Sequence, residues 1–94
     1  MVIGLCTIEL SLPVPRSLKD KRGALKPLIA QMRREFNVAV AEVDRQDLWQ
    51  RATLGVATVS NDAGHAHGLL ENVIGWIDRT QPQVFVSDWR VDML

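Results

Sequence analysis

Cationic side chains gather in one short stretch of the chain, and four of them follow the spacing of an α-helix. Separated by three, four and seven residues, these four align along one side of a helix. Cations in the first turn of a helix lie at the positive end of its dipole, which disfavours each by a few tenths to about 1 kcal/mol. A bound anion reverses this effect, because free backbone N–H groups and cations then face it together. The anion- or RNA-binding surface that we predict consists of Arg16, Lys19, Lys21, Arg22, Lys26 and Arg33.

Two other interpretations of these cations remain open. Runs of charge usually form a solvated face, and the stems of lysine and arginine also cover apolar surface. The cations also have carboxylates available within the chain. Residues 16–34 hold seven cations and one carboxylate, a net charge of +6, whereas the rest of the chain holds four cations and ten carboxylates, a net charge of −6. The overall charge of zero therefore hides a polarised molecule, whose acidic part is a second candidate partner for the cations.

If RNA is bound, we expect the protein to contact its backbone or its shape. Base stacking of the kind used by RNA-recognition modules needs aromatic side chains on the central strands of the sheet. The two expected central strands, residues 2–12 and 51–60, contain none. Affinity for RNA should then fall steeply as the salt concentration rises.

Trp49 is the aromatic residue of the polar turn expected at residues 44–50. A tryptophan in such a turn serves either as an anchor for a partner or as a lid that folds back over the sheet. We name Trp49 as a partner-contact residue and keep the lid as the alternative.

The chain contains no recognisable catalytic constellation or cofactor motif. His65 and His67 diverge by about 200° on a helix, and no set of cysteines and histidines completes a metal site around them. Glu42, Asp44 and Asp47 are more typical of a solvated hairpin than of a site for a hard cation. The two histidines are the only candidate general bases for a serine or threonine nucleophile, and both lie in one short segment. We therefore predict a non-enzymatic protein with no catalytic residues, no metal and no cofactor.

Length and composition are typical of one soluble domain spanning residues 1–94, of which 47% are hydrophobic. The single cysteine, Cys6, excludes an internal disulfide and fits a reducing cytoplasm. It lies on the expected inward face of a strand, so we expect a packed thiol. No apolar run approaches the length of a membrane span, and no basic segment precedes the apolar start. We therefore expect a cytoplasmic protein, with neither insertion into a membrane nor export.

Hydrophobic periodicity predicts six helices and strands. The first strand, residues 2–12, alternates apolar and polar side chains. Ser17 offers an N-cap for a helix over residues 17–36. Within this helix Gly23 and Pro27 are unfavourable, so either the helix kinks at Pro27 or its regular part begins near Ala24. The remaining predicted elements are a hairpin of strands at 37–44 and 51–60, a helix from about 63 to 80, and a last strand at 83–91.

The order β-α-β-β-α-β predicts a ferredoxin-like sandwich, in which a four-stranded antiparallel sheet carries both helices on one face. The other face of the sheet should then be open. The segments at residues 2–5 and 84–86 are nevertheless apolar at successive positions, which favours a partner on that open face. We expect a homodimer through it, because symmetric pairing is the common outcome for such patches. A sheet edge, or residues 91–94 folded over the face, are alternatives.

Several motifs resemble those of the YlxP-like family of small bacterial domains of unknown function. They are Ser-Leu-Lys-Asp-Lys-Arg (17–22), Arg-Glu-Phe-Asn-Val (34–38), Ala-Glu-Val-Asp (41–44) and Gln-Asp-Leu-Trp-Gln-Arg-Ala (46–52). The resemblance covers nearly the whole chain and implies a ferredoxin-like fold, a cytoplasmic setting and genes near those for translation and ribosome maturation. It implies no established activity and no assigned catalytic residues. Gly23 and the Gly/His-rich start of the second helix depart from the family pattern.

The cations and the resemblance together predict RNA or a ribosomal particle as the partner. Two hypotheses from other classes remain. One is a homodimeric scaffold that binds proteins through the open sheet face and Trp49. The other is a protein that binds a phosphorylated small molecule at the start of the first helix.

Overall fold

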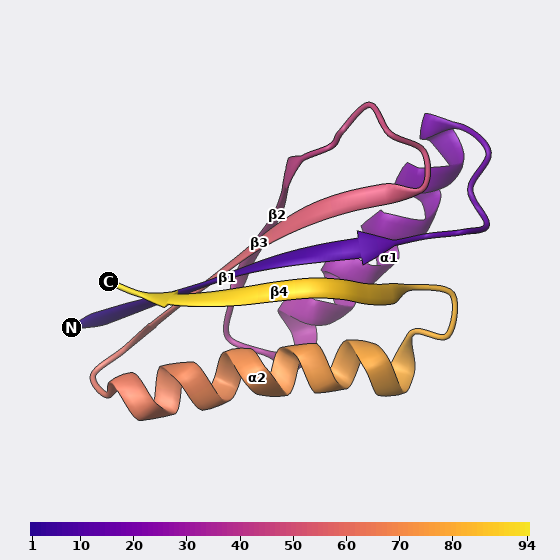
Figure 1. Cartoon of the computed structure of the whole chain (residues 1–94). Helices are drawn as coiled ribbons and strands as arrows, with labels where there is room; N and C mark the ends of the chain where they lie inside the picture. Colours follow the sequence, from indigo (N-terminus) through magenta and orange to yellow (C-terminus); the bar gives the residue numbers. More distant parts are fainter.

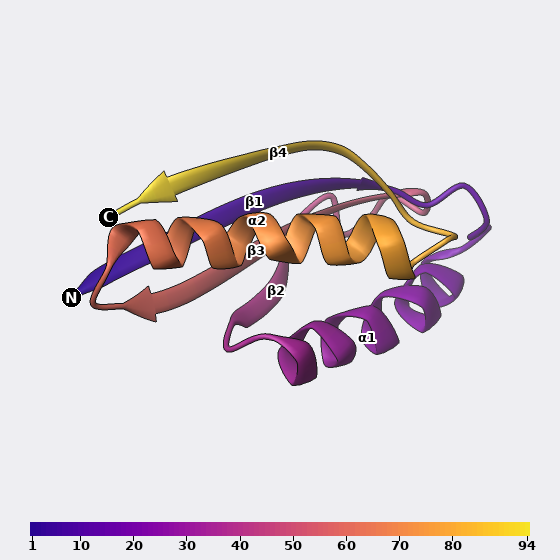
Figure 2. The same cartoon turned by 90° about the horizontal axis from the view of Figure 1, so that it is seen from below.

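Six helices and strands follow one another in the predicted order in the computed structural model, which describes residues 1–94 (Figure 1). The four strands form one antiparallel sheet in the order β2-β3-β1-β4. Both helices lie on the same side of this sheet (Figure 2). The ferredoxin-like α+β architecture is therefore confirmed. The elements are β1 (Val2–Ser11), α1 (Leu18–Glu35), β2 (Ala39–Asp44), β3 (Arg51–Ser60), α2 (Ala63–Thr80) and β4 (Phe85–Met93).

The core lies between the sheet and the two helices, as the alternation of β1 requires. Every second residue of β1 is apolar and faces the helices. The residues of β3 that pair with these β1 residues are also buried. Each helix adds an apolar stripe to this layer. Neither helix is both long and apolar enough to cross a membrane. The inward residues are Cys6, Ile8 and Leu10 of β1, Ala52, Leu54 and Val56 of β3, Leu25, Leu28 and Met32 of α1, and Leu70, Val73 and Ile77 of α2.

α1 is one continuous helix, with Pro27 inside it. Its start is fixed by two capping hydrogen bonds: Ser17 Oγ accepts one from Asp20 N at 3.0 Å, and Asp20 Oδ2 accepts one from Arg16 N, the residue before the N-cap, at 3.2 Å. The alternative of a separate first turn, with the regular helix beginning near Ala24, is therefore wrong. Pro27 lies on an exposed part of the helix, so its ring disturbs no core contact.

β4 begins two residues later than its apolar run predicts. The predicted strand was 83–91, but Val84 N donates to Gln81 O at 3.2 Å, so the turn after α2 extends to Val84. At the other end the chain stays paired with β1, where Leu94 N donates to Ile3 O at 2.7 Å. Residues 91–94 therefore extend the edge strand and do not fold over the open face of the sheet.

Candidate nucleic-acid interface

Exposed cations form a strip along the flank of α1 that lies next to the edge strand β2. Lys19, Arg22 and Lys26 are exposed, and their side chains make no ion pair and no hydrogen bond within the chain. Farther along, Arg33 is also exposed, and its Nη2 donates to Val40 O of β2 at 2.7 Å. This contact fixes the side of α1 on which the strip lies. We call the residues Lys19, Arg22, Lys26 and Arg33 the cationic strip; Arg16, also exposed, precedes it.

Lys21 does not belong to this exposed surface, which corrects the prediction made for it. Its side chain is only 1% exposed, on the same side of α1 as the apolar stripe. The ammonium Nζ donates to three backbone carbonyls of the β2–β3 hairpin, and Glu42 Oε2 lies 2.9 Å from it. An ammonium has three N–H donors, so the three carbonyls use all of them and Glu42 contributes charge without a hydrogen bond. The three acceptors are Arg45 O at 2.9 Å, Gln46 O at 3.2 Å and Arg51 O at 3.2 Å.

The hairpin loop that carries Trp49 is thereby held against the first turn of α1. Lys21 binds carbonyls at both ends of the loop, and Gln50 Nε2 donates to Pro13 O and Pro15 O of the β1–α1 connection at 3.0 and 2.9 Å. Trp49 itself is 53% exposed, beside an exposed Leu48. The loop therefore presents an aromatic face to solvent at the end of α1 where the cationic strip begins, and Trp49 is not a closed lid over the sheet.

The other residues that could take part in catalysis or metal binding lie apart from one another. His67 Nδ1 lies 3.1 Å from Glu71 Oε1 on the exposed side of α2, and His65 is exposed beside it. No three histidine, cysteine, aspartate or glutamate residues are grouped so as to hold a metal ion. Cys6 is buried, and burial raises the pKa of its thiol from 9.0 to about 11. Such a thiol stays protonated at neutral pH and has little nucleophilic character.

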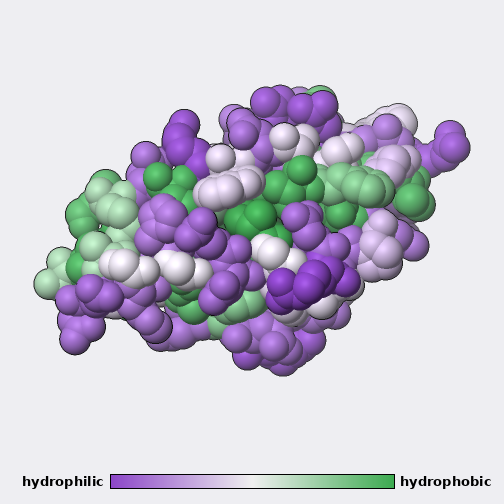
Figure 3. Space-filling model, turned by 60° about the horizontal axis from the view of Figure 1, so that its bottom comes forward, coloured by the Kyte–Doolittle hydropathy of each residue, from purple (hydrophilic) through white to green (hydrophobic).

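The open face of the sheet contains a hollow of about 430 Å³ with mostly apolar walls. Its floor is made of small residues from β2 and β3, while Leu5 and Val43 stand at its sides and are exposed. The helical side looks different, since hydrophilic side chains cover most of it and apolar ones gather between them and at one end (Figure 3). The floor residues are Ala39, Ala41, Gly55 and Ala57.

With this geometry established, comparison with known proteins decides the family. The family described as "Protein of unknown function (DUF503)" matches residues 3–91. The chain belongs to this family. It is also 35% identical over 77 residues to a Bacillus subtilis (strain 168) protein named "Uncharacterized protein YlxP", a match that covers 82% of this chain and 84% of that protein. The resemblance inferred from the motifs is thus confirmed.

Proposed function

We propose that this protein is a non-enzymatic, cytoplasmic RNA-binding module, on free RNA or on a ribosomal particle, that contacts phosphates through the cationic strip of α1. One observation carries the proposal. Lys19, Arg22 and Lys26 have no carboxylate partner, although the chain contains as many carboxylates as lysines and arginines, 11 of each. Cations clustered along one face of a helix, with no internal ion pairs, are the kind of electrostatic surface that binds a polyanion.

The acidic part of the chain makes its ion pairs elsewhere. Glu42 pairs with the buried Lys21, Glu9 with Arg45 at 3.1 Å, and Asp92 with Arg90 at 3.0 Å. The interpretation of the strip as an internal partner of the acidic residues therefore has no contact in its favour.

The length of the strip favours a polyanion over a small phosphorylated ligand. Lys19 and Arg33 are 14 positions apart, which corresponds to about 21 Å along a helix that rises 1.5 Å per residue. One phosphate group can engage one end of such a strip, whereas the phosphate row of a nucleic acid can follow all of it. Because the central strands carry no aromatic residue, an unpaired base would have Trp49 as its stacking surface.

The test is binding to a structured RNA at a series of salt concentrations, for the native protein and two charge-matched variants. The first variant is Lys19→Ala/Arg22→Ala/Lys26→Ala, and the control, Arg34→Ala/Arg79→Ala/Arg90→Ala, also removes three exposed cations. We expect the first variant to bind more weakly and to lower the salt slope by about one per cation removed. The control should bind almost as the native protein does. Equal losses in both variants, or salt-insensitive binding by the native protein, would contradict the proposal.

A homodimer through the open sheet face is the second candidate, and the apolar hollow on that face favours it. Exposed Leu5 and Val43 beside a floor of small residues form a surface that costs free energy in water. A second copy would cover it and leave the cationic strip on the other side of the sandwich accessible. Dimerisation and RNA binding are therefore compatible.

A further inference from the structure

Trp49 is exposed on a loop that is already held in place. Lys21 fixes both ends of the β2–β3 loop, and Gln50 ties it to the β1–α1 connection, in each case by hydrogen bonds to backbone carbonyls. The indole makes none of these contacts and is 53% exposed. A group that binds Trp49 therefore meets a surface that needs little further ordering, which favours affinity.

A shallow hollow of about 390 Å³ lies at this loop, and it suits a flat, uncharged group. Leu48 lines it beside Trp49 and adds apolar surface. The two charged residues of the lining, Asp47 and Arg51, have opposite charges, so a phosphate would gain little net attraction there. A nucleobase is flat and uncharged, and its π-face stacks on an exposed aromatic ring whatever the base.

The hollow lies at one end of the cationic strip. Both overall views show the β2–β3 loop next to the first turn of α1 (Figures 1 and 2). Lys21, in that first turn, is bonded to the loop, and the strip begins in the same turn with Lys19. Arg33, at the other end of the strip, lies about 21 Å farther along the helix.

No other aromatic side chain is available to an RNA that follows the strip. Phe36 comes soon after Arg33, but its ring packs against Trp76 with the ring centroids 5.8 Å apart. Phe85 and Trp89 belong to β4, which is the opposite edge of the sheet from β2. The strip therefore offers phosphate contacts along its length and a stacking surface at the Lys19 end alone.

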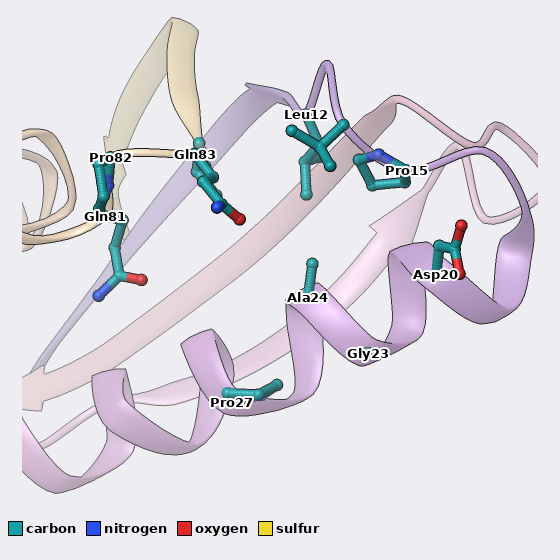
Figure 4. A pocket seen from close by; sticks show the side chains of 11 residues that line it. Leu12, Pro15, Asp20, Gly23, Ala24, Pro27, Gln81, Pro82 and Gln83 are labelled. Carbon is teal, nitrogen blue, oxygen red and sulfur yellow. The ribbon is translucent and has the colours of Figure 1, made fainter.

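The opposite flank of α1 is not suited to RNA. Figure 4 shows that flank, where Gly23, Ala24 and Pro27 line a pocket of about 420 Å³ between α1, the β1–α1 connection and the turn before β4. The only charged residue of this pocket is Asp20, and a carboxylate repels phosphates. At 100° per residue, the centre of this flank lies about 120° around the helix from the cationic strip. The electrostatics of α1 therefore direct RNA phosphates to its β2 flank.

We infer that the RNA that this protein recognises is a duplex with an unpaired nucleotide at the end that meets Trp49. Bases inside a duplex stack on one another, so only an unpaired base has a face free for the indole. A wholly single-stranded RNA would leave its other bases without an aromatic partner along the strip. The strip follows the duplex phosphates, and the unpaired base stacks on Trp49 in the hollow. This inference rests on the proposed function and specifies the RNA that it requires.

The test compares three RNAs at a series of salt concentrations: a blunt duplex, the same duplex with an unpaired nucleotide at its ends, and one of its strands alone. We expect the duplex with unpaired ends to bind about tenfold more tightly than the blunt duplex, with the same salt slope. The single strand should bind more weakly than the duplex with unpaired ends. Equal affinity for the two duplexes, or tightest binding of the single strand, would overturn the inference.

Trp49→Ala removes the stacking surface, and Trp89→Ala is its matched control because that indole is also exposed, by 42%, on β4. The Trp49→Ala variant should bind both duplexes as the native protein binds the blunt one, with an unchanged salt slope. Trp89→Ala should keep the native preference for unpaired ends. A preference that survives Trp49→Ala, or that Trp89→Ala also removes, would refute a stacking role for Trp49.

A direct readout comes from Trp76→Phe/Trp89→Phe, which leaves Trp49 as the only tryptophan of the chain. Stacking of a base should quench its fluorescence when the duplex with unpaired ends binds, and the blunt duplex should leave it nearly unchanged. Equal fluorescence at saturation with either duplex would contradict the inference.

The strip variant Lys19→Ala/Arg22→Ala/Lys26→Ala separates this inference from the proposed function. It should bind both duplexes more weakly and with a lower salt slope, but keep the ratio of their affinities. Salt-dependent binding without any preference for unpaired ends would refute the inference and leave the proposed function standing. No salt-dependent binding to any of the three RNAs would refute both.

Discussion

Lys21 shows how one side chain can organise a loop that has no regular structure of its own. Lysine is almost never fully buried unless its charge is compensated. Here three carbonyl oxygens and a carboxylate surround the ammonium, much as oxygen ligands surround a bound cation. The hairpin loop also contains Arg45 in the left-handed backbone region, with φ of 60°, whose Nε is bound to Glu9 Oε2. The position of Trp49 thus depends on contacts made by its neighbours.

Replacing Lys21 by methionine should destabilise the protein strongly. Three carbonyls would lose their donor and Glu42 would lose its counter-charge, so we expect the free energy of unfolding to fall by about 3–5 kcal/mol. Urea denaturation measures this loss. Lys19→Met, two positions away on the exposed surface, is the matched control and should change stability by no more than about 0.5 kcal/mol. Similar small effects of both substitutions would show that the buried contacts contribute little.

Cys6 should be unreactive in the folded protein at neutral pH. Burial raises the pKa of its thiol to about 11, so the thiolate population at pH 8 falls about a hundredfold from that of an ordinary cysteine. Alkylation by iodoacetamide should therefore be at least that much slower in buffer than in urea, and should accelerate as the pH approaches 11. Equal rates in the two solvents at pH 8 would contradict this expectation.

The same pKa shift predicts the sign of a pH effect on stability. Between pH 9 and about 11 the unfolded chain releases the thiol proton while the folded chain retains it. The unfolded state then binds fewer protons, so the free energy of unfolding contributed by Cys6 decreases as the pH rises through this window. Below pH 9 both states hold the proton and the contribution is constant. Cys6→Ala should lack this component when unfolding is measured across the window.

Local sequence patterns predict well which helices and strands form and in what order, because each pattern reflects the burial of the residues that carry it. The alternation of β1 and the N-cap at Ser17 placed their elements within one residue of the observed bounds. The start of β4 was misplaced because Val84 is apolar for a different reason: it is buried in a turn, not in the sheet. An apolar run indicates burial but does not by itself distinguish these two environments.

The candidate site was harder to predict than the fold, because its contacts join segments that are far apart. Lys21 was wrongly predicted in the exposed cationic surface, because its main partners are backbone carbonyls of the hairpin, which carry no side-chain signal. The pocket beside Gly23 is likewise formed by three separate segments. The exposed strip was predictable because its spacing is local to one helix.

Two glycines with opposite surroundings should respond oppositely to alanine. At Gly23 the added Cβ meets nothing, so the gain in helix propensity should raise the free energy of unfolding by about 0.5–1 kcal/mol. At Gly4 of β1 the Cβ would lie 3.0 Å from Leu70 Cδ1 in the core and 3.4 Å from Met93 Sδ. Leu70 is fully buried and has little freedom to move, so this substitution should lower stability by about 1–3 kcal/mol. Thermal or urea unfolding of the two variants measures both changes in the free energy of unfolding. A lower stability of the Gly23→Ala variant would show that the backbone conformation at Gly23 requires glycine.

For the molecule as a whole, the sandwich separates three surfaces that need not interfere with one another. The cationic strip lies along the β2 flank of α1, the pocket between α1 and the turn before β4 lies on another flank of α1, and the apolar hollow lies across the sheet from both helices. The proposed RNA surface and the proposed dimer surface therefore do not overlap. Substitutions confined to one of these surfaces should leave binding at the other unchanged, which makes the proposals separable by experiment.

The homodimer proposal is decided by the mass of the protein in solution. Stable interfaces bury about 800 Å² per partner, and pairing through the open sheet face would bury the exposed Leu5 and Val43 beside the apolar hollow. We therefore expect light scattering to report twice the protomer mass of 10.5 kDa. Leu5→Glu places a carboxylate beside the hollow and, on pairing, would bury it without a partner, so this variant should be monomeric. Val14→Glu adds the same charge at an exposed apolar residue outside the sheet and should remain dimeric. A native protein that stays monomeric at high concentration, or a Leu5→Glu variant that stays dimeric, would exclude the sheet face as the interface.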